Sequence, residues 1–195
     1  TSSCDMSDWS DGRLASLGVA QATLVGHSQG VLVALETASR HPERVTALTL
    51  IAGAMAIPVN DALIEMSQSA PEKAFRMMTS WGHGPGAHKF DNTQPGHSFL
   101  GYGRRVMAQN DAAALHADLV ACNDYDGGKD AAAAVTQPSL CLLAGKDRMT
   151  PVKFGRKMAE QISGAQCHVF ERAGHFLPAE FPIEVNDAMA AFLAR

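Results

Sequence analysis

The chain has 195 residues, of which 46% are hydrophobic and 18% are charged, a composition typical of one globular domain with a substantial core. Its formal net charge of −4 and the lack of a basic patch argue against nucleic acid or an anionic membrane surface as a partner. No stretch approaches the roughly 20 apolar residues of a membrane span, and the first residues lack the basic and apolar parts of a secretory signal. We therefore expect a cytoplasmic protein.

An α/β pattern begins in the N-terminal quarter of the chain. The first dozen residues are polar and show no periodicity, and a short helical segment then ends near Gly18, a residue suited to a helix C-terminus. Residues 22–26 predict a buried strand. The apolar spacing from Gln29 predicts a helix that stops before Pro42, and residues 44–53 predict a second strand. Strand, helix and strand with short connections predict a parallel sheet flanked by helices.

The middle of the chain has a different pattern. Residues 54–137 contain helical stretches rich in Met, Ala and Gln, together with a loop rich in Gly, His and Pro, and they give no strand signal. We interpret this segment as a helical cap insertion. Residues 1–53 and 138–195 then form the α/β core.

The alternation of strand and helix resumes after the insertion. Residues 139–144 predict a strand, and the helix after it is expected to have Thr150 as its N-cap and Pro151 at its first position. Residues 167–170 predict the last strand, and an amphipathic helix closes the chain. The side chains expected to face inward from that helix are Ile183, Val185, Met189, Phe192 and Leu193.

The four cysteines give no metal-binding or redox motif. They include no C-x-x-C pair and no zinc-finger spacing with histidine. Cys141 and Cys167 lie in apolar runs and are predicted to be buried thiols, which suits a reducing compartment.

One short motif carries chemical information. Gly26 to Gly30 read G-H-S-Q-G, which matches G-x-S-x-G. This motif presents a nucleophilic serine only where it connects a strand to a helix. There the serine occupies a strained corner, and the glycines remove Cβ atoms that would collide as strand and helix approach. The predicted strand and helix flank Ser28 as required, which favours a nucleophile over a plain turn. His27 should point away from the site and is interpreted as a packing residue.

A serine nucleophile needs a base, and the base needs an orienting acid. In this architecture the chain order is serine, acid, histidine. Asp147 follows the predicted strand at 139–144, and His175 follows the predicted strand at 167–170. Because sites in open α/β sheets form at the carboxyl ends of strands, Ser28, Asp147 and His175 should lie at one edge of the sheet.

The segments LVGHSQG, AGKDRMTP and AGHFLPAEFP resemble the nucleophile, acid and histidine segments of the α/β-hydrolase superfamily. The resemblance runs from about residue 12 to the end and makes the insertion the cap of that fold. It implies that Ser28 is the nucleophile, Asp147 the acid and His175 the base, with the backbone N–H of Gln29 as one oxyanion donor.

The same resemblance implies that strands are missing. Members of the superfamily carry several strands and a helix before the serine strand, including the loop that supplies a second oxyanion donor, and only about two dozen residues precede Ser28. We therefore expect a truncated α/β-hydrolase fold that is incomplete at its N-terminus. The serine strand would then have an unpaired edge that favours self-association.

The insertion is expected to supply the substrate pocket. Met78, Trp81 and Tyr102 are the candidates for its apolar lining, although any one of them can instead form the core of the cap. His83, His88 and His97 are irregularly spaced and lack accompanying acids, so we expect no metal and no organic cofactor. Arg104 and Arg105 are either solvated or placed to meet a substrate carboxylate.

The sequence thus predicts a serine hydrolase of a small hydrophobic carboxylic ester or a related acyl compound, acting through an acyl-enzyme. The triad residues alone do not separate this activity from C–C bond or amide hydrolysis, or from a cofactor-free peroxidase. A non-catalytic binding scaffold with the same fold is a further alternative.

Overall fold

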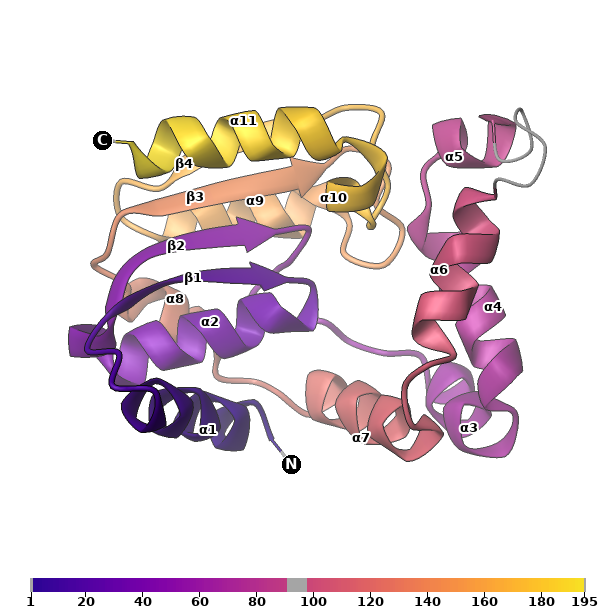
Figure 1. Ribbon diagram of the computed structural model, residues 1–195, viewed down its shortest axis with the longest axis horizontal. Coiled ribbons are helices and arrows are strands. Elements are labelled where there is room, and N and C mark those ends of the chain that lie inside the picture. The colour runs from indigo at the N-terminus through magenta and orange to yellow at the C-terminus, as the bar shows by residue number, and fades with distance from the viewer. Residues whose placement is uncertain (1, 91–97, 195) are drawn as a thin grey trace.

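The computed structural model describes residues 2–90 and 98–194 and confirms the predicted α/β class (Figure 1). Within these residues one parallel sheet has four strands in the order β1-β2-β3-β4. The strands are β1 (Ala22–His27), β2 (Val45–Ile51), β3 (Ser139–Ala144) and β4 (Gln166–Phe170). The four segments predicted to be strands are therefore confirmed, with ends shifted by one or two residues.

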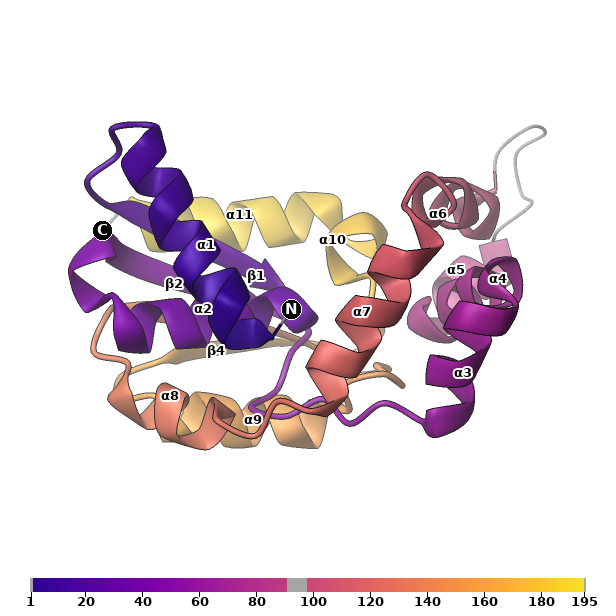
Figure 2. The same cartoon turned by 90° about the horizontal axis from the view of Figure 1, so that it is seen from below.

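Helices cover both faces of the sheet. The helices near the sheet are α1 (Ser3–Ser16), α2 (Gln29–Arg40), the 3₁₀ turn η1 (Pro42–Arg44), α8 (Gly128–Ala134), α9 (Val152–Gln161), α10 (Leu177–Glu180) and α11 (Pro182–Leu193). Figure 2 shows α2, α8 and α9 on one face and α11 on the other. The strand β3 is central, and all six of its residues are buried.

Two apolar clusters fill the space between these layers. One lies under α2, α8 and α9 and includes Leu35, Leu48 and Met158, and the other lies under α11 and includes Leu142 and Val185. All five side chains are at most 2% exposed. Burying side chains of this size stabilises a fold by about 1.5–3 kcal/mol each, so these clusters fix the strand ends to which the functional loops are attached.

The remaining helices form a separate group beyond the carboxyl ends of the strands (Figure 1). They are α3 (Asp61–Ser69), α4 (Pro71–Gly82), α5 (Pro85–Phe90), α6 (Phe99–Met107) and α7 (Ala112–Asn123). Their own apolar cluster is centred on Leu63, Ala74 and Leu119. The division of the chain at 54–137 stays a prediction, and α8, which falls within that range, packs against α2 and α9.

The strand that leads to the serine corner is at an edge of the sheet. Among the described residues β1 pairs with β2 only, and Val25 on β1 is 52% exposed. An apolar strand with an unpaired edge favours pairing with another chain. Self-association through β1 remains a prediction.

The N-terminal helix is longer than the sequence patterns indicate. The first dozen residues were expected to be irregular, yet α1 begins at Ser3 with a capping box in which Ser2 and Asp5 bond to each other's backbone N–H groups. The helix is polar, so its sequence has no apolar periodicity that would predict it. It is fixed against α2 by polar contacts, such as the Arg40–Asp8 ion pair at 3.1 Å.

Two other expectations about burial were wrong in part. In α11, Val185 and Phe192 are buried, whereas Ile183 and Leu193 are 71% and 49% exposed because they lie at the two ends of the helix. Of the two thiols predicted to be buried, Cys141 on the central strand is buried but Cys167 is exposed. Cys167 lies on β4, which is the other edge strand among the described residues.

Candidate active site

Ser28 occupies a strained backbone conformation between β1 and α2. Its φ and ψ are 56° and −119°, in a region that residues with a side chain rarely adopt. Such a conformation costs about 1–3 kcal/mol and persists only where the surroundings impose it. The backbone N–H of Ser28 donates to Ile51 O at 3.0 Å, which continues the β1–β2 ladder through the corner. The predicted strand–serine–helix corner is therefore present.

The two glycines of the motif have different roles. A Cβ on Gly26 would collide with the backbone of Gly30 and would lie 2.8 Å from the N atom of Val31, so only glycine lets α2 approach β1 this closely. A Cβ on Gly30 would meet nothing within 4 Å. The expectation that both glycines remove steric collisions is therefore wrong for Gly30.

Asp147 and His175 form a buried pair. The Nδ1 atom of His175 lies 2.8 Å from Oδ2 of Asp147, and the two residues are 2% and 7% exposed. Because a carboxylate only accepts hydrogen bonds, Nδ1 carries a proton in this pair. The neutral ring then has its lone pair on Nε2, which is the form that can take a proton from a hydroxyl. The sequence placed these two residues together correctly.

The carboxylate of Asp147 is held on both oxygens. Its Oδ1 accepts from the backbone N–H groups of Met149 and Thr150, each at 2.8 Å, and its Oδ2 lies 2.7 Å from the hydroxyl of Thr150. Burial by itself raises the pKa of Asp147, but the hydrogen bond and charge of His175 and the bonds from Thr150 together hold that pKa below its usual range. Asp147 is therefore ionised at neutral pH and can stabilise an imidazolium.

Thr150 is not the N-cap of α9 as expected, since the helix begins at Val152 and Pro151 is the cap residue. The Thr150 hydroxyl lies 2.7 Å from Ala52 O and 3.2 Å from Nδ1 of His175, in addition to its contact with Asp147. It connects the end of β2 to the acid–histidine pair. The spacing D-x-x-T is the sequence signal for this role, although Thr150 also fits the pattern of a helix N-cap.

His27 contacts the candidate base instead of pointing away from the site. Its Nε2 lies 2.7 Å from the carbonyl oxygen of His175, and the two rings are 4.9 Å apart between centroids. The carbonyl only accepts, so Nε2 of His27 donates. Burial, followed by repulsion from His175, lowers the pKa of His27 to about 4, which keeps its ring neutral at pH 7. Sequence reasoning missed this contact because only folding brings the two residues together.

A cavity of about 280 Å³ opens at Ser28. Two of the three residues proposed to bind substrate, Met78 and Trp81, line it together with Ser28 and Gln29. Tyr102 is 63% exposed on α6 and is not among the described lining residues. The complete lining is Ser28, Gln29, Ile57, Pro58, Val59, Asn60, Leu63, Met78, Trp81, Leu115, Asp118, Leu119, Cys122, Arg148 and Met149.

The cavity is mainly apolar with one acidic and one basic side chain. Burial raises the pKa of Asp118. The Arg148 guanidinium lies 6.0 Å from the ring centroid of Trp81. Arg104 and Arg105, the residues considered for a substrate carboxylate, lie on α6 and are not among the described lining residues.

Ser28 and the acid–histidine pair meet at one end of the sheet without a direct hydrogen bond in this structure. The hydrogen bonds of the described residues include none between the Ser28 hydroxyl and His175. The contact of His175 with His27 nevertheless brings its loop against the strand end that precedes Ser28. Gln29 is the first residue of α2, so its backbone N–H is one of the unpaired donors at a helix N-terminus.

The described residues include no cluster of three or more potential metal ligands. His83 Nδ1 bonds to Thr79 O, and His88 Nε2 bonds to Ser80 O, so both rings are engaged by the backbone of α4. His97 lies outside the described residues. No helix in the described part of the chain is both long enough and apolar enough to cross a membrane.

The chain is similar in sequence and in fold to known proteins. The model of the alpha/beta hydrolase family matches residues 3–188. The 2-hydroxymuconate semialdehyde hydrolase of Pseudomonas sp. (strain CF600) is 27% identical, over 96% of this chain and 67% of that protein. The crystal structure of the enol-lactonase from Burkholderia xenovorans LB400 is 19% identical and superimposes with a TM-score of 0.91, covering 100% of this chain and 74% of that one.

A second relative is similar over nearly the same share of this chain. The 2-hydroxy-6-oxononadienedioate/2-hydroxy-6-oxononatrienedioate hydrolase of Burkholderia vietnamiensis is 26% identical over 94% of this chain and 66% of its own length. The chain thus spans about two thirds of the length of these curated relatives.

Proposed function

The chain belongs to the alpha/beta hydrolase family, and we propose that it is a serine hydrolase of a small hydrophobic carboxylic ester or a related acyl compound. The observation that carries the proposal is the buried 2.8 Å contact between Asp147 and His175, at the sheet end where Ser28 is held in a strained corner. Structural packing alone requires neither the strained serine nor the buried acid–histidine pair. Together they match the needs of a nucleophile, a base and an orienting acid.

In the proposed mechanism, Nε2 of His175 takes the proton of the Ser28 hydroxyl, and the Ser28 oxygen attacks the substrate carbonyl. The negative charge that develops on the carbonyl oxygen is stabilised by the N–H of Gln29 at the N-terminus of α2. His175 then gives its proton to the leaving group. In the second half of the reaction His175 activates a water molecule, which hydrolyses the acyl-enzyme and releases the carboxylic acid product from Ser28. The ionised Asp147 stabilises the imidazolium of His175 in both halves of the reaction.

The cavity supports a small and mainly apolar substrate. Its volume of about 280 Å³ lies near the lower limit of the range for ligand pockets. Met78 and Trp81 would contact the acyl or alcohol part, while Arg148 and Asp118 would meet polar groups of the substrate.

C–C bond hydrolysis is the second candidate. The names of two relatives support it, since one is a 2-hydroxymuconate semialdehyde hydrolase and the other a 2-hydroxy-6-oxononadienedioate/2-hydroxy-6-oxononatrienedioate hydrolase. The same three residues serve either reaction, and the substrate decides which bond breaks. Turnover of 2-hydroxymuconate semialdehyde in preference to p-nitrophenyl esters would favour this candidate.

Covalent labelling tests the proposal. A fluorophosphonate probe should modify Ser28, as located by peptide mass spectrometry, and the modification should disappear in Ser28→Ala and His175→Ala. Absence of labelling in the folded wild-type protein, or labelling of another residue, would contradict the proposal and favour a non-catalytic scaffold.

A further inference from the structure

The loop that carries His175 is in direct contact with the end of α4. The backbone N–H of Phe176 donates to Gly82 O at 3.2 Å, and the rings of His83 and Phe176 lie 4.7 Å apart between centroids. A Cβ on Gly174 would collide with the backbone N atom of Gly84. Residues 82–84 and 174–176 therefore touch backbone to backbone, although about 90 residues separate them in the sequence.

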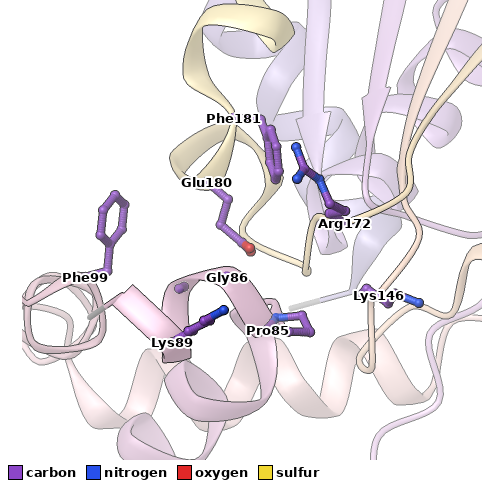
Figure 3. A pocket seen from close by; sticks show the side chains of 9 residues that line it. Pro85, Gly86, Lys89, Phe99, Lys146, Arg172, Glu180 and Phe181 are labelled. Atoms are coloured by element: carbon purple, nitrogen blue, oxygen red, sulfur yellow. The ribbon is translucent and has the colours of Figure 1, made fainter. Parts of the chain in front are cut away.

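A single carboxylate joins these two segments. Glu180 Oε2 accepts from the N–H of Gly84 at 3.0 Å and from the N–H of Gly174 at 3.1 Å, and its Oε1 lies 3.1 Å from the same Gly174 nitrogen. Figure 3 shows the Glu180 side chain reaching from α10 toward the beginning of α5. A carboxylate is a strong hydrogen-bond acceptor, and its bonds to backbone N–H groups contribute more than bonds between neutral groups.

The position of Glu180 matters because Gly174 is the residue before the candidate base. The backbone of His175 is then held from several sides: His27 binds its carbonyl oxygen, Glu180 binds the preceding N–H, and Gly82 binds the following one. Of these three contacts, the one made by Gly82 comes from residues 82–84, and Glu180 binds the N–H of Gly84 in that segment as well as the N–H of Gly174.

We infer that Glu180 is a positioning residue, whose carboxylate holds residues 82–84 against the loop 174–176 and thereby fixes the imidazole of His175 for catalysis. This inference rests on the proposed function. Glu180 touches neither Ser28 nor Asp147 through any hydrogen bond of the described residues, so it acts through the backbone of Gly174. A shift of about 1 Å in a catalytic group is sufficient to reduce a rate about 10²-fold.

Steady-state kinetics with p-nitrophenyl acetate test the catalytic part of the inference. Glu180→Ala removes both acceptor oxygens and should lower kcat by about 10- to 100-fold, with KM changed by less than about twofold. Glu180→Gln keeps the volume and one acceptor oxygen and should fall between wild type and Glu180→Ala. The matched control is Glu184→Ala, on the exposed face of α11 nearby, which should keep the wild-type kcat.

Amide hydrogen exchange provides a readout that does not depend on activity. In Glu180→Ala, peptides covering both 82–86 and 173–177 should exchange faster than in wild type, while Glu184→Ala should leave them unchanged. If Glu180→Ala does not fold, Glu180→Gln carries both measurements. Gly84→Ala disturbs the same junction from the other segment, because its Cβ would lie 2.7 Å from both Glu180 Oε2 and the backbone N atom of Gly174, and it should reproduce the kinetic loss.

The outcomes separate this inference from the proposed function. A wild-type protein that neither hydrolyses the ester nor reacts with the fluorophosphonate refutes the proposed function and the catalytic role of Glu180 with it. An active wild type together with a Glu180→Ala variant of unchanged kcat, or with unchanged exchange in both segments, overturns the inference alone. A loss that appears in KM and not in kcat also overturns it.

Discussion

Two parts of the candidate site are built differently. Asp147 and His175 follow β3 and β4, and both side chains are buried and held by hydrogen bonds from several elements. Ser28 follows β1, one of the two edge strands among the described residues, and its corner is fixed mainly by the close approach of α2 at Gly26. The acid–histidine pair therefore depends on polar contacts, whereas the serine corner depends on backbone sterics.

The largest expected effect is on the acid. Asp147→Asn keeps the shape of the side chain but removes the acceptor that fixes the proton on Nδ1 of His175. The ring then adopts the wrong tautomer, and kcat for p-nitrophenyl acetate should fall by about 10⁴-fold. A decrease of less than about tenfold would mean that Asp147 is only a structural partner of His175.

The stability of the serine corner should depend on side-chain volume at Gly26. Gly26→Ala forces a Cβ into the backbone of α2 and should lower the free energy of unfolding by about 3 kcal/mol. Gly30→Ala is the matched control, because its Cβ meets nothing within 4 Å, and it should change stability by no more than about 1 kcal/mol. Urea denaturation of both variants measures the difference, and equal losses would contradict the steric account.

His27 joins the two parts of the site and should make stability depend on pH. Its folded pKa of about 4 is below the ordinary value of 6.5, so folding favours the neutral ring. Its contribution is complete above pH 6.5 and is lost as pH falls from 6.5 to about 4. The loss by pH 4.5 should be about 2–3 kcal/mol.

The comparison variant for that titration is His27→Gln, which keeps a donor for the carbonyl of His175 but does not titrate. Urea denaturation at pH 7 and at pH 4.5 should show a smaller loss in His27→Gln than in wild type. Asp147, whose pKa is lowered, loses its contribution only below about pH 4 and does not obscure the difference. Identical pH dependence in the two proteins would be inconsistent with a half-buried His27 whose neutral form folding favours.

The smallest effect is expected at Thr150. Thr150→Val keeps the shape of the side chain but removes the hydroxyl that contacts Ala52 O and Asp147. Leaving a buried acceptor without its donor should cost about 1–3 kcal/mol of stability, measured by thermal or urea unfolding. A variant as stable as wild type would show that this hydroxyl does not support the acid–histidine pair.

The sequence predicted the sheet and the pairing of Asp147 with His175 because strand patterns and chain order carry that information locally. A buried run such as residues 139–144 is unambiguous, and the acid and the histidine follow directly from the strand ends. The start of α1 was missed because a polar helix fixed by capping and ion pairs leaves no apolar period. The exposure of Cys167 was missed because the sequence does not reveal which strand lies at the edge.

The supporting contacts of the site could not be predicted for a different reason. His27, Thr150 and Glu180 act on residues between 3 and 148 positions away, and through backbone atoms in most cases. A hydrogen bond from a side-chain ring to a backbone carbonyl far away in the sequence leaves no pattern of residue types from which it could be predicted. The exposure of Tyr102 could not be predicted either. An aromatic residue in a helical segment has the same sequence pattern whether it faces the cavity or the solvent, and Tyr102 is 63% exposed.

The most direct test of the central claim is the pre-steady-state reaction of the wild-type protein with excess p-nitrophenyl acetate, followed by peptide mass spectrometry. The account predicts a burst of nitrophenol with an acetyl group on Ser28, and no burst in His175→Ala. Steady hydrolysis without acetylation of Ser28, or a burst that survives the loss of His175, would contradict it.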